Sequence, residues 1–170
     1  MAEMIFRMHE GDLTVTGALG RLQTAGRSVV LESTGLDNIG NLVATDRLFI
    51  LGHGETTNIG GKTAAELAKL LTSSGLKSGV HIELVACNSG TGNAPFALEL
   101  KVELVSRKVV PASVSGGTSY MQVAADGTTT VADYNFATSQ WSAQITDGSE
   151  TVQTPWGPRL RNVVKNFKTG

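Results

Sequence analysis

Cysteine is nearly absent from this sequence, which contains only Cys87. A lone cysteine cannot form an internal disulfide, so the fold must rest on its core, and a reducing compartment suits it. The formal net charge is −1 and aromatic residues make up 5%. This excludes a strong field for nucleic acid or an anionic membrane, and it excludes base-stacking platforms. No apolar run approaches a membrane span. We therefore expect neither nucleic acid nor membrane as a partner.

What the chain does contain is typical of a globular protein. Its 170 residues are 41% hydrophobic and 17% charged, which predicts one domain over residues 1–170 with a core of its own. The 20 glycines indicate many tight turns, because glycine reaches positive φ without steric cost.

Strand-like segments open the chain. Residues 4–9 form an apolar run and residues 13–17 alternate with period two, which predicts an opening pair of strands. Residues 27–32 are apolar and β-branched, which predicts a further strand.

The central segment has the clearest pattern. Residues 47–51 are almost continuously apolar, as in a strand covered on both faces. Residues 63–71 then change to helical spacing, with Thr63 and Glu66 in a capping-box pattern and Gly75 as the stop.

The same alternation repeats further along. Residues 81–86 predict another strand, and residues 94–106 predict a helix with Leu98, Val102 and Val105 on one face. Strand, helix, strand, helix is the signature of a parallel sheet.

Beyond residue 108 the sequence becomes rich in β-formers. Asp126-Gly127 between residues 120–123 and 128–131 is a strong hairpin signal. The predicted fold class is therefore α/β, with a mostly parallel central sheet flanked by helices and a C-terminal β-hairpin or flap region. A basic tail closes the chain with Arg159, Arg161, Lys165 and Lys168.

Two residues with reactive side chains follow predicted strands. His53 and Cys87 each stand where an apolar strand ends in a glycine-containing turn, and the carboxyl ends of parallel strands form a ligand crevice. A histidine beside a cysteine can take the thiol proton. The backbone N–H groups of Gly54 and Cys87 are candidates for an oxyanion hole. The sequence thus predicts a thiol nucleophile with an imidazole base.

Other interpretations remain open for these residues. Free cysteine is often simply a buried core residue, and a histidine between glycines can be a surface turn residue. We expect no metal site, because the histidines and the cysteine lack zinc-ligand spacings. The remaining histidines and the nearby carboxylates receive no role: His9, His81, Asp46 and Glu55.

The substrate side of the crevice is expected to be small and uncharged. Ser89, Ser113 and Ser115 are the candidate substrate-binding residues, and the β-rich stretch beside them offers main-chain partners to an extended peptide. An unpaired charge would be costly there. If the site cleaves a peptide bond, we expect a small or apolar residue on the amino-terminal side of that bond.

Three segments of this chain match a familiar pattern. Leu51–Gly54, followed by Thr63–Ala68 and then Ile82–Ser89, resembles the self-cleaving cysteine protease domain of multifunctional RTX toxins. The same His-Gly and Cys pattern recurs in the wider caspase and clostripain group. The resemblance covers about residues 47–135.

The resemblance implies a caspase-like fold with His53 and Cys87 as the catalytic dyad of a cysteine endopeptidase. Its substrate would be a peptide or protein, its own chain included, cut after leucine, in the cytoplasm or as a secreted toxin or effector module in a reducing cytosol. No cofactor is required for the chemistry. The resemblance implies inositol hexakisphosphate as the activator. However, the basic residues that bind this activator in the toxin domains have no obvious counterpart in this sequence.

Two alternatives from other classes stay open. A caspase-like module can be catalytically silent and serve in binding. A thiol, an imidazole and an oxyanion hole would equally serve a hydrolase of small amides or esters.

Overall fold

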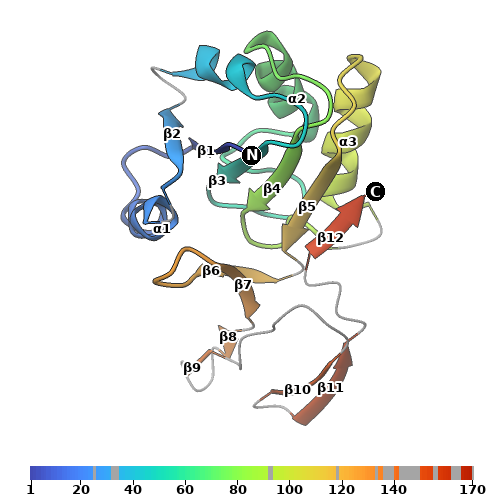
Figure 1. Ribbon diagram of the computed structural model, residues 1–170. Helices are drawn as coiled ribbons and strands as arrows, with labels where there is room; N and C mark the ends of the chain where they lie inside the picture. The colour runs from blue at the N-terminus through green and yellow to red at the C-terminus, as the bar shows by residue number, and fades with distance from the viewer. Residues whose placement is uncertain are drawn as a thin grey trace.

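The computed structural model describes residues 1–24, 26–31, 35–91, 94–117, 119–132, 134–135, 140–141, 150–154, 157–161 and 166–169, with side chains up to Val131. A six-stranded sheet in the order β2-β1-β3-β4-β5-β12 forms its centre (Figure 1). Its parallel strands are β1 (Glu3–Arg7), β2 (Ser28–Leu31), β3 (Arg47–Leu51), β4 (His81–Val85) and β5 (Ser113–Gly117). The edge strand β12 (Asn166–Thr169) runs antiparallel to β5. The predicted fold class is confirmed.

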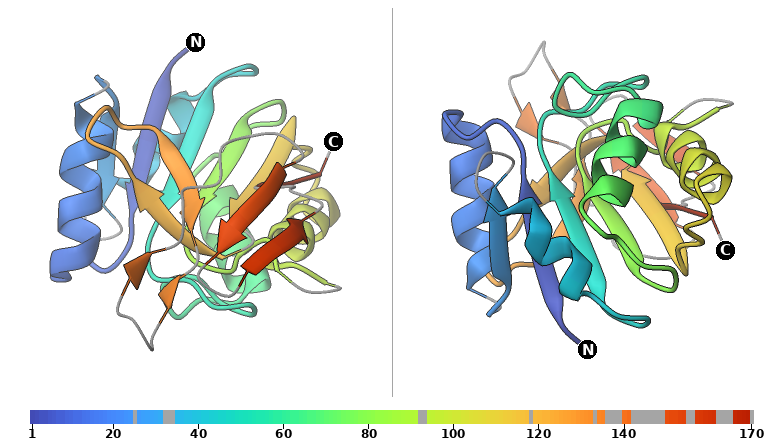
Figure 2. Two further views of the ribbon diagram at one scale, coloured as in Figure 1. Left: turned by 90° about the horizontal axis from the view of Figure 1, so that it is seen from below. Right: turned by 90° about the horizontal axis from the view of Figure 1, so that it is seen from above.

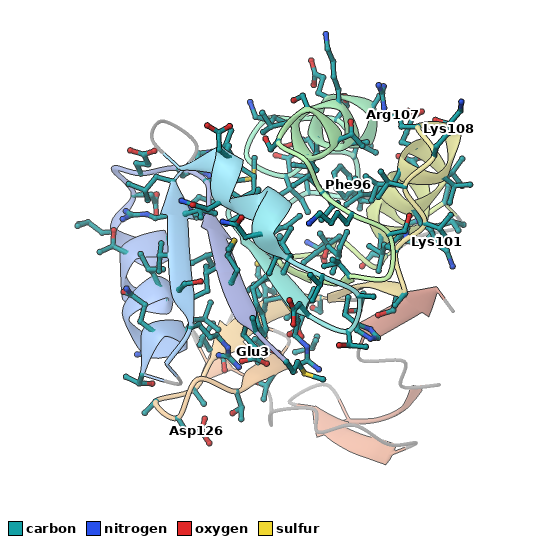
Figure 3. All side chains as sticks on the ribbon, turned by 45° about the horizontal axis from the view of Figure 1, so that its top comes forward. Glu3, Phe96, Lys101, Arg107, Lys108 and Asp126 are labelled. Atoms are coloured by element: carbon teal, nitrogen blue, oxygen red, sulfur yellow. The ribbon has the colours of Figure 1, made fainter. Side chains whose placement is uncertain are left out.

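One face of the sheet is covered by α2 (Ala64–Ser73), α3 (Phe96–Ser106) and the 3₁₀ helix η1 (Leu36–Asn41). Alternate strand residues such as Leu48, Ile50 and Leu84 point to this side and are fully buried. Phe96 lies between α2 and α3 in Figure 3. This is the larger of the two apolar clusters of the fold.

The start and the end of α2 follow local sequence signals, as predicted. The Thr63 hydroxyl accepts from the Glu66 N–H, and the Glu66 carboxylate accepts from the Thr63 N–H at 2.9 Å, which completes the capping box. After the helix, Gly75 adopts a φ of +83°, the left-handed conformation that glycine supplies at helix ends.

The predicted face of α3 is wrong. The structure buries Phe96, Leu100 and Leu104, whereas Val102 and Val105 are 59% and 44% exposed. This helix is apolar on several sides, so spacing alone does not show which side faces the sheet.

A helix replaces the second strand predicted for the start of the chain. Residues 13–17 belong to α1 (Leu13–Gln23), which buries Val15, Leu19 and Leu22 against the second face of the sheet. The period-two pattern was too short to separate strand from helix, and the helix begins because the Asp12 side chain accepts from the Val15 N–H at 2.9 Å.

The predicted hairpin is confirmed. β6 (Tyr120–Val123) pairs with β7 (Thr129–Ala132) in antiparallel fashion. The turn contains Gly127 at φ +82°, and the Asp126 carboxylate accepts from the Thr128 N–H at 3.0 Å. The hairpin lies on the second face of the sheet beside α1 (Figure 2, left).

Two short pairs of strands follow, β8 (Tyr134–Asn135) with β9 (Gln140–Trp141) and β10 (Glu150–Thr154) with β11 (Gly157–Arg161). Lys165 and the side chains of the basic tail lie outside the described residues, so the binding of a polyanion that this run of charges suggests stays a prediction. In the described part of the chain, no helix combines the length and the hydropathy needed to cross a membrane.

Candidate functional site

The order of the strands reverses between β1 and β3. From β1 the chain turns to β2 on one side, and from β3 it continues to β4 and β5 on the other. The loops after two such strands separate, which opens a crevice at their carboxyl ends. His9 follows β1, His53 follows β3, and Cys87 follows the neighbouring β4. Topology therefore brings these three side chains to one edge of the sheet.

His53 is held by three contacts. Its Nε2 lies 3.0 Å from the Oδ2 of Asp12. Its backbone N–H donates to His9 Nδ1 at 3.4 Å, and its carbonyl accepts from the Gly60 N–H at 2.8 Å. The His9 and His53 rings lie 5.4 Å apart between centroids. The imidazole is thus oriented while its side chain stays 54% exposed.

Asp12 has two roles, because it caps α1 and also pairs with His53. The hydrogen bond from the Val15 N–H, followed by the one from His53, lowers the pKa of the Asp12 carboxyl below its usual range. The carboxylate therefore stays charged across the neutral range. Sequence reasoning missed this residue because it placed a strand where α1 begins, although an Asp before an apolar segment is a helix-start signal.

The two carboxylates near His53 in the sequence have other partners in the structure. Glu55 accepts from the Asn58 side chain at 2.9 Å. Asp46 precedes β3, at the opposite edge of the sheet, and accepts from the backbone N–H groups of Ala2 and Val43. Neither of them orients His53.

The turn that carries Cys87 is fixed by main-chain hydrogen bonds to residues 117 and 119. Asn88 adopts a φ of +56°, its N–H donates to Ser119 O at 2.9 Å, and the Gly90 N–H donates to Gly117 O at 2.8 Å. Ser89 is fully buried, and its hydroxyl donates to Ala86 O at 2.9 Å. The structure therefore places Ser89 under the turn, while Cys87 itself is partly exposed.

The loops of His53 and Cys87 touch at Gly54. A Cβ at this position would lie 2.6 Å from Cys87 O and 2.7 Å from Ala86 Cβ, so only glycine allows this approach. Among the described residues, the N–H groups of Gly54 and Cys87 have no hydrogen-bond partner. Within this part of the chain, neither predicted oxyanion donor is used by an internal hydrogen bond.

His53 and Cys87 line one pocket of about 670 Å³, here called the thiol pocket. Its walls are α1 and β6. A smaller slot of about 80 Å³ opens beside both side chains and is lined by apolar groups that include Val15, Leu51 and Val85. Within the described chain, the thiol and the imidazole share this pocket without a direct hydrogen bond.

Ser113 and Ser115 lie elsewhere. They line a second pocket of about 580 Å³, here called the polar pocket, together with Arg27, Arg47 and Glu83. The polar pocket lies where the hairpin crosses the amino-terminal half of the sheet. The structure thus brings His53, Gly54 and Cys87 together but leaves the predicted substrate-binding serines outside the thiol pocket.

The two arginines of the polar pocket are paired with acidic side chains. Arg27 Nε lies 2.7 Å from Glu3 Oε2, and Arg47 lies 3.7 Å from Glu3. The hairpin closes the pocket, because Arg27 donates to Gly127 O at 3.0 Å and the Thr129 hydroxyl donates to Glu83 at 2.5 Å. Glu3 and Asp126 mark the sheet and the hairpin tip in Figure 3.

Metal ligands are not grouped in the part of the chain that the structure describes. No three His, Cys, Asp or Glu side chains lie so that they could hold one ion. The chemistry available to this edge of the sheet is that of a thiol, an imidazole oriented by a carboxylate, and two backbone N–H donors.

Fold and site together define a class: α/β proteins with a thiol and an imidazole at the carboxyl edge of a parallel sheet. The chain belongs to the family described as Domain of unknown function (DUF8616), whose model matches residues 37–131, more than half of the chain. The matched segment includes His53, Cys87 and the hairpin, and it excludes Asp12. A search of the curated proteins gives no match.

Proposed function

We propose that this protein is a cysteine endopeptidase in which Cys87 is the nucleophile and His53 is the general base. The observation that carries the proposal is that both side chains line the thiol pocket, with His53 oriented by Asp12 at 3.0 Å. A base within reach of the nucleophile and a third group that orients the base form the arrangement that nucleophilic catalysis needs.

The chemistry uses only groups of the chain and water. His53 takes the thiol proton, and the Cys87 sulfur forms a bond to the peptide carbonyl carbon while the carbonyl electron pair moves to oxygen. The N–H groups of Gly54 and Cys87 stabilise this oxyanion. The C–N bond then breaks, the amine leaves with a proton from His53, and water hydrolyses the thioester to restore the thiol.

A peptide suits the thiol pocket better than a small amide or ester does. The pocket continues from Cys87 along α1 and β6 instead of closing around the thiol. An extended chain would lie along this groove and place one side chain in the apolar slot. A small or apolar residue before the cut is therefore expected, as is cleavage of the protein's own chain if an exposed segment reaches the groove.

Mass spectrometry of the purified protein, incubated alone and with a peptide mixture, tests the proposal. The Cys87→Ala and His53→Ala variants should each lose nearly all cleavage, and the double variant should be no worse, because such residues act as a unit. Substantial cleavage by Cys87→Ala would overturn the assignment. Circular dichroism should show that both variants stay folded, since neither side chain is in the core.

A binding module without catalysis is the second candidate, favoured by the lack of a direct hydrogen bond between His53 and Cys87. Alkylation by iodoacetamide separates the two. In an enzyme the Cys87 thiol should react at neutral pH at least about tenfold faster in the wild type than in His53→Ala, because the imidazole promotes the thiolate. In a binding module both proteins should react alike.

A further inference from the structure

The thiol pocket extends into a groove between α1 and β6. On the helix side it is lined by Thr14, Gly17, Ala18 and Arg21, which share one face because residues three, four and seven apart stack on a helix. On the strand side it is lined by residues 120–124. Cys87 and His53 lie at the end where α1 begins, since His53 pairs with Asp12.

The two ends of the groove differ in charge. Near the thiol the lining is apolar, with Ala18, Met121 and Val123. Arg21 is the permanently charged side chain among the lining residues. Its Nη1 donates to Val123 O at 2.8 Å, which holds the guanidinium across the groove from α1 to the hairpin.

No acidic side chain in the described part of the chain pairs with Arg21. The nearest acid on the hairpin, Asp126, accepts instead from the backbone and the hydroxyl of Thr128. Arginine carries five N–H donors in a planar fork, so donors remain beyond the one used by Val123. A fork of this kind matches a carboxylate.

We propose that the groove selects peptides that carry a carboxylate about two or three residues from the bond to be cut. Arg21 comes seven positions after Thr14 on the helix, a rise of about 10 Å, and an extended peptide advances about 3.3 Å per residue. Side chains on a helix lean toward its N-terminus, which brings the guanidinium back toward the thiol. The proposal rests on the proposed function and names its substrate class.

The carboxylate has two sources, an Asp or Glu side chain within a longer peptide or the free C-terminus of a short one. Both offer Arg21 the same two oxygens. Amidation of the peptide removes the C-terminal carboxylate and leaves the side-chain carboxylate in place, so it separates the two sources.

Fluorescence anisotropy with the Cys87→Ala protein measures this selectivity without requiring any chemistry. The probes are fluorescein-labelled peptides with leucine at the expected cleavage position and a single Glu moved along the chain, each paired with its Gln counterpart, with free or amidated C-terminus. Arg21→Gln in the same background removes the charge, and Arg21→Lys keeps it without the fork. Arg107→Gln, at the residue after α3, is the matched control.

A Glu peptide should bind about three- to tenfold more tightly than its Gln counterpart at one or two positions only. Arg21→Gln should abolish the difference, Arg21→Lys should retain part of it, and Arg107→Gln should leave it intact. Tighter binding of peptides with a free C-terminus than of their amidated counterparts, with Glu and Gln bound equally, assigns the site to a C-terminal carboxylate.

Equal binding of Glu and Gln peptides at every position, with no loss of binding when the C-terminus is amidated, would overturn the proposal, and so would a failure of all peptides to bind. Neither result bears on Cys87 chemistry, which the iodoacetamide comparison reports separately. Conversely, an unreactive thiol with intact Glu selectivity would remove the peptidase function and leave the binding preference standing.

Discussion

The two faces of the central sheet are built differently from the same strands. Leu84 points to the face under α2 and α3 and is fully buried in the larger apolar cluster. On the other face α1 and the hairpin cover an apolar half that ends in the thiol pocket, while the half around Glu83 is polar. The first face stabilises the fold, and the second carries the groups that can bind and react.

Neighbouring residues of β4 test this contrast most strongly. Leu84→Ala should lower the free energy of unfolding by about 2–5 kcal/mol, because it leaves a cavity in the core. Val85→Ala, on the other face beside Cys87, should cost roughly 1–3 kcal/mol because fewer methyl groups are lost. Urea denaturation gives both values, and only Val85→Ala should change the iodoacetamide rate of Cys87. Equal rate changes in the two variants would contradict a division of roles between the faces.

Gly54→Ala should disturb the junction of the two loops at the thiol pocket. The new methyl group would meet the backbone of the Cys87 turn, which cannot give way as a flexible side chain would. We expect a loss of roughly 2–4 kcal/mol, measured by thermal or urea denaturation.

Gly20→Ala is the matched control for this change. Gly20 lies within α1, and nothing stands within 4 Å of its Cβ position. An alanine there should stabilise the protein by about 0.5–1 kcal/mol through helix propensity. If Gly54→Ala were as harmless as Gly20→Ala, the close approach of the two loops would be wrong.

Arg27→Met tests the polar half of the second face. The Arg27 side chain is 11% exposed and ties β1 to the hairpin, so its loss should cost roughly 1–3 kcal/mol and make the hairpin more sensitive to protease. Arg107→Met is the comparison, because its ion pair with Glu103 is exposed at 3.7 Å and should be worth about 0.5 kcal/mol or less. If the hairpin of Arg27→Met were as resistant to protease as that of the wild type, the contacts of Arg27 would not be what holds the hairpin on the sheet.

The smallest expected effect is on how the free energy of unfolding depends on pH in the acidic range. The pKa of Asp12 is lowered from its ordinary value of 3.8 by the Val15 N–H and by His53. A carboxyl whose pKa is depressed by folding stabilises the fold above that ordinary value and loses the contribution as the pH falls through the folded value. Asp12→Asn keeps the cap and removes the charge.

The free energy of unfolding should therefore fall less in Asp12→Asn than in the wild type between about pH 5 and about pH 3. Asp46, Glu66 and Asp126, whose pKa values are also lowered, are common to both proteins and cancel in the comparison. Parallel stability curves would show that the Asp12 charge is not coupled to folding.

Local patterns predicted the elements whose signals are complete within a few residues. These local signals do not depend on residues far away in the sequence. They are the capping box of α2, the Asp-Gly turn of the hairpin and the apolar runs of β3 and β4. The meeting of His53 and Cys87 in one pocket followed from topology, because parallel strands end at the same edge.

The features that the sequence did not reveal depend on distant contacts. Thr14, Val15 and Thr16 favour strand by propensity, but α1 forms because its buried face packs on the sheet, and tertiary packing overrides propensity. Without α1, the sequence could not show that Asp12 pairs with His53 or that Arg21 lines the thiol pocket. Similarly, β12 pairs with β5 across about fifty residues of sequence, which no local pattern indicates, and the serines of β5 were assigned to the wrong end of the sheet.

The turn that carries Cys87 is joined to the chain before the hairpin by main-chain hydrogen bonds from the N–H groups of Asn88 and Gly90. Bonds of this kind do not depend on side-chain identity, and at Asn88 the constraint on the residue type is instead the left-handed φ of +56°, which Asn and Gly tolerate best. An insertion between β5 and β6 would shift Ser119 O, the acceptor for Asn88, and proline at either donor position would remove an N–H. Within the DUF8616 family, chain length between β5 and β6 is therefore a more telling mark of an intact site than residue identity there.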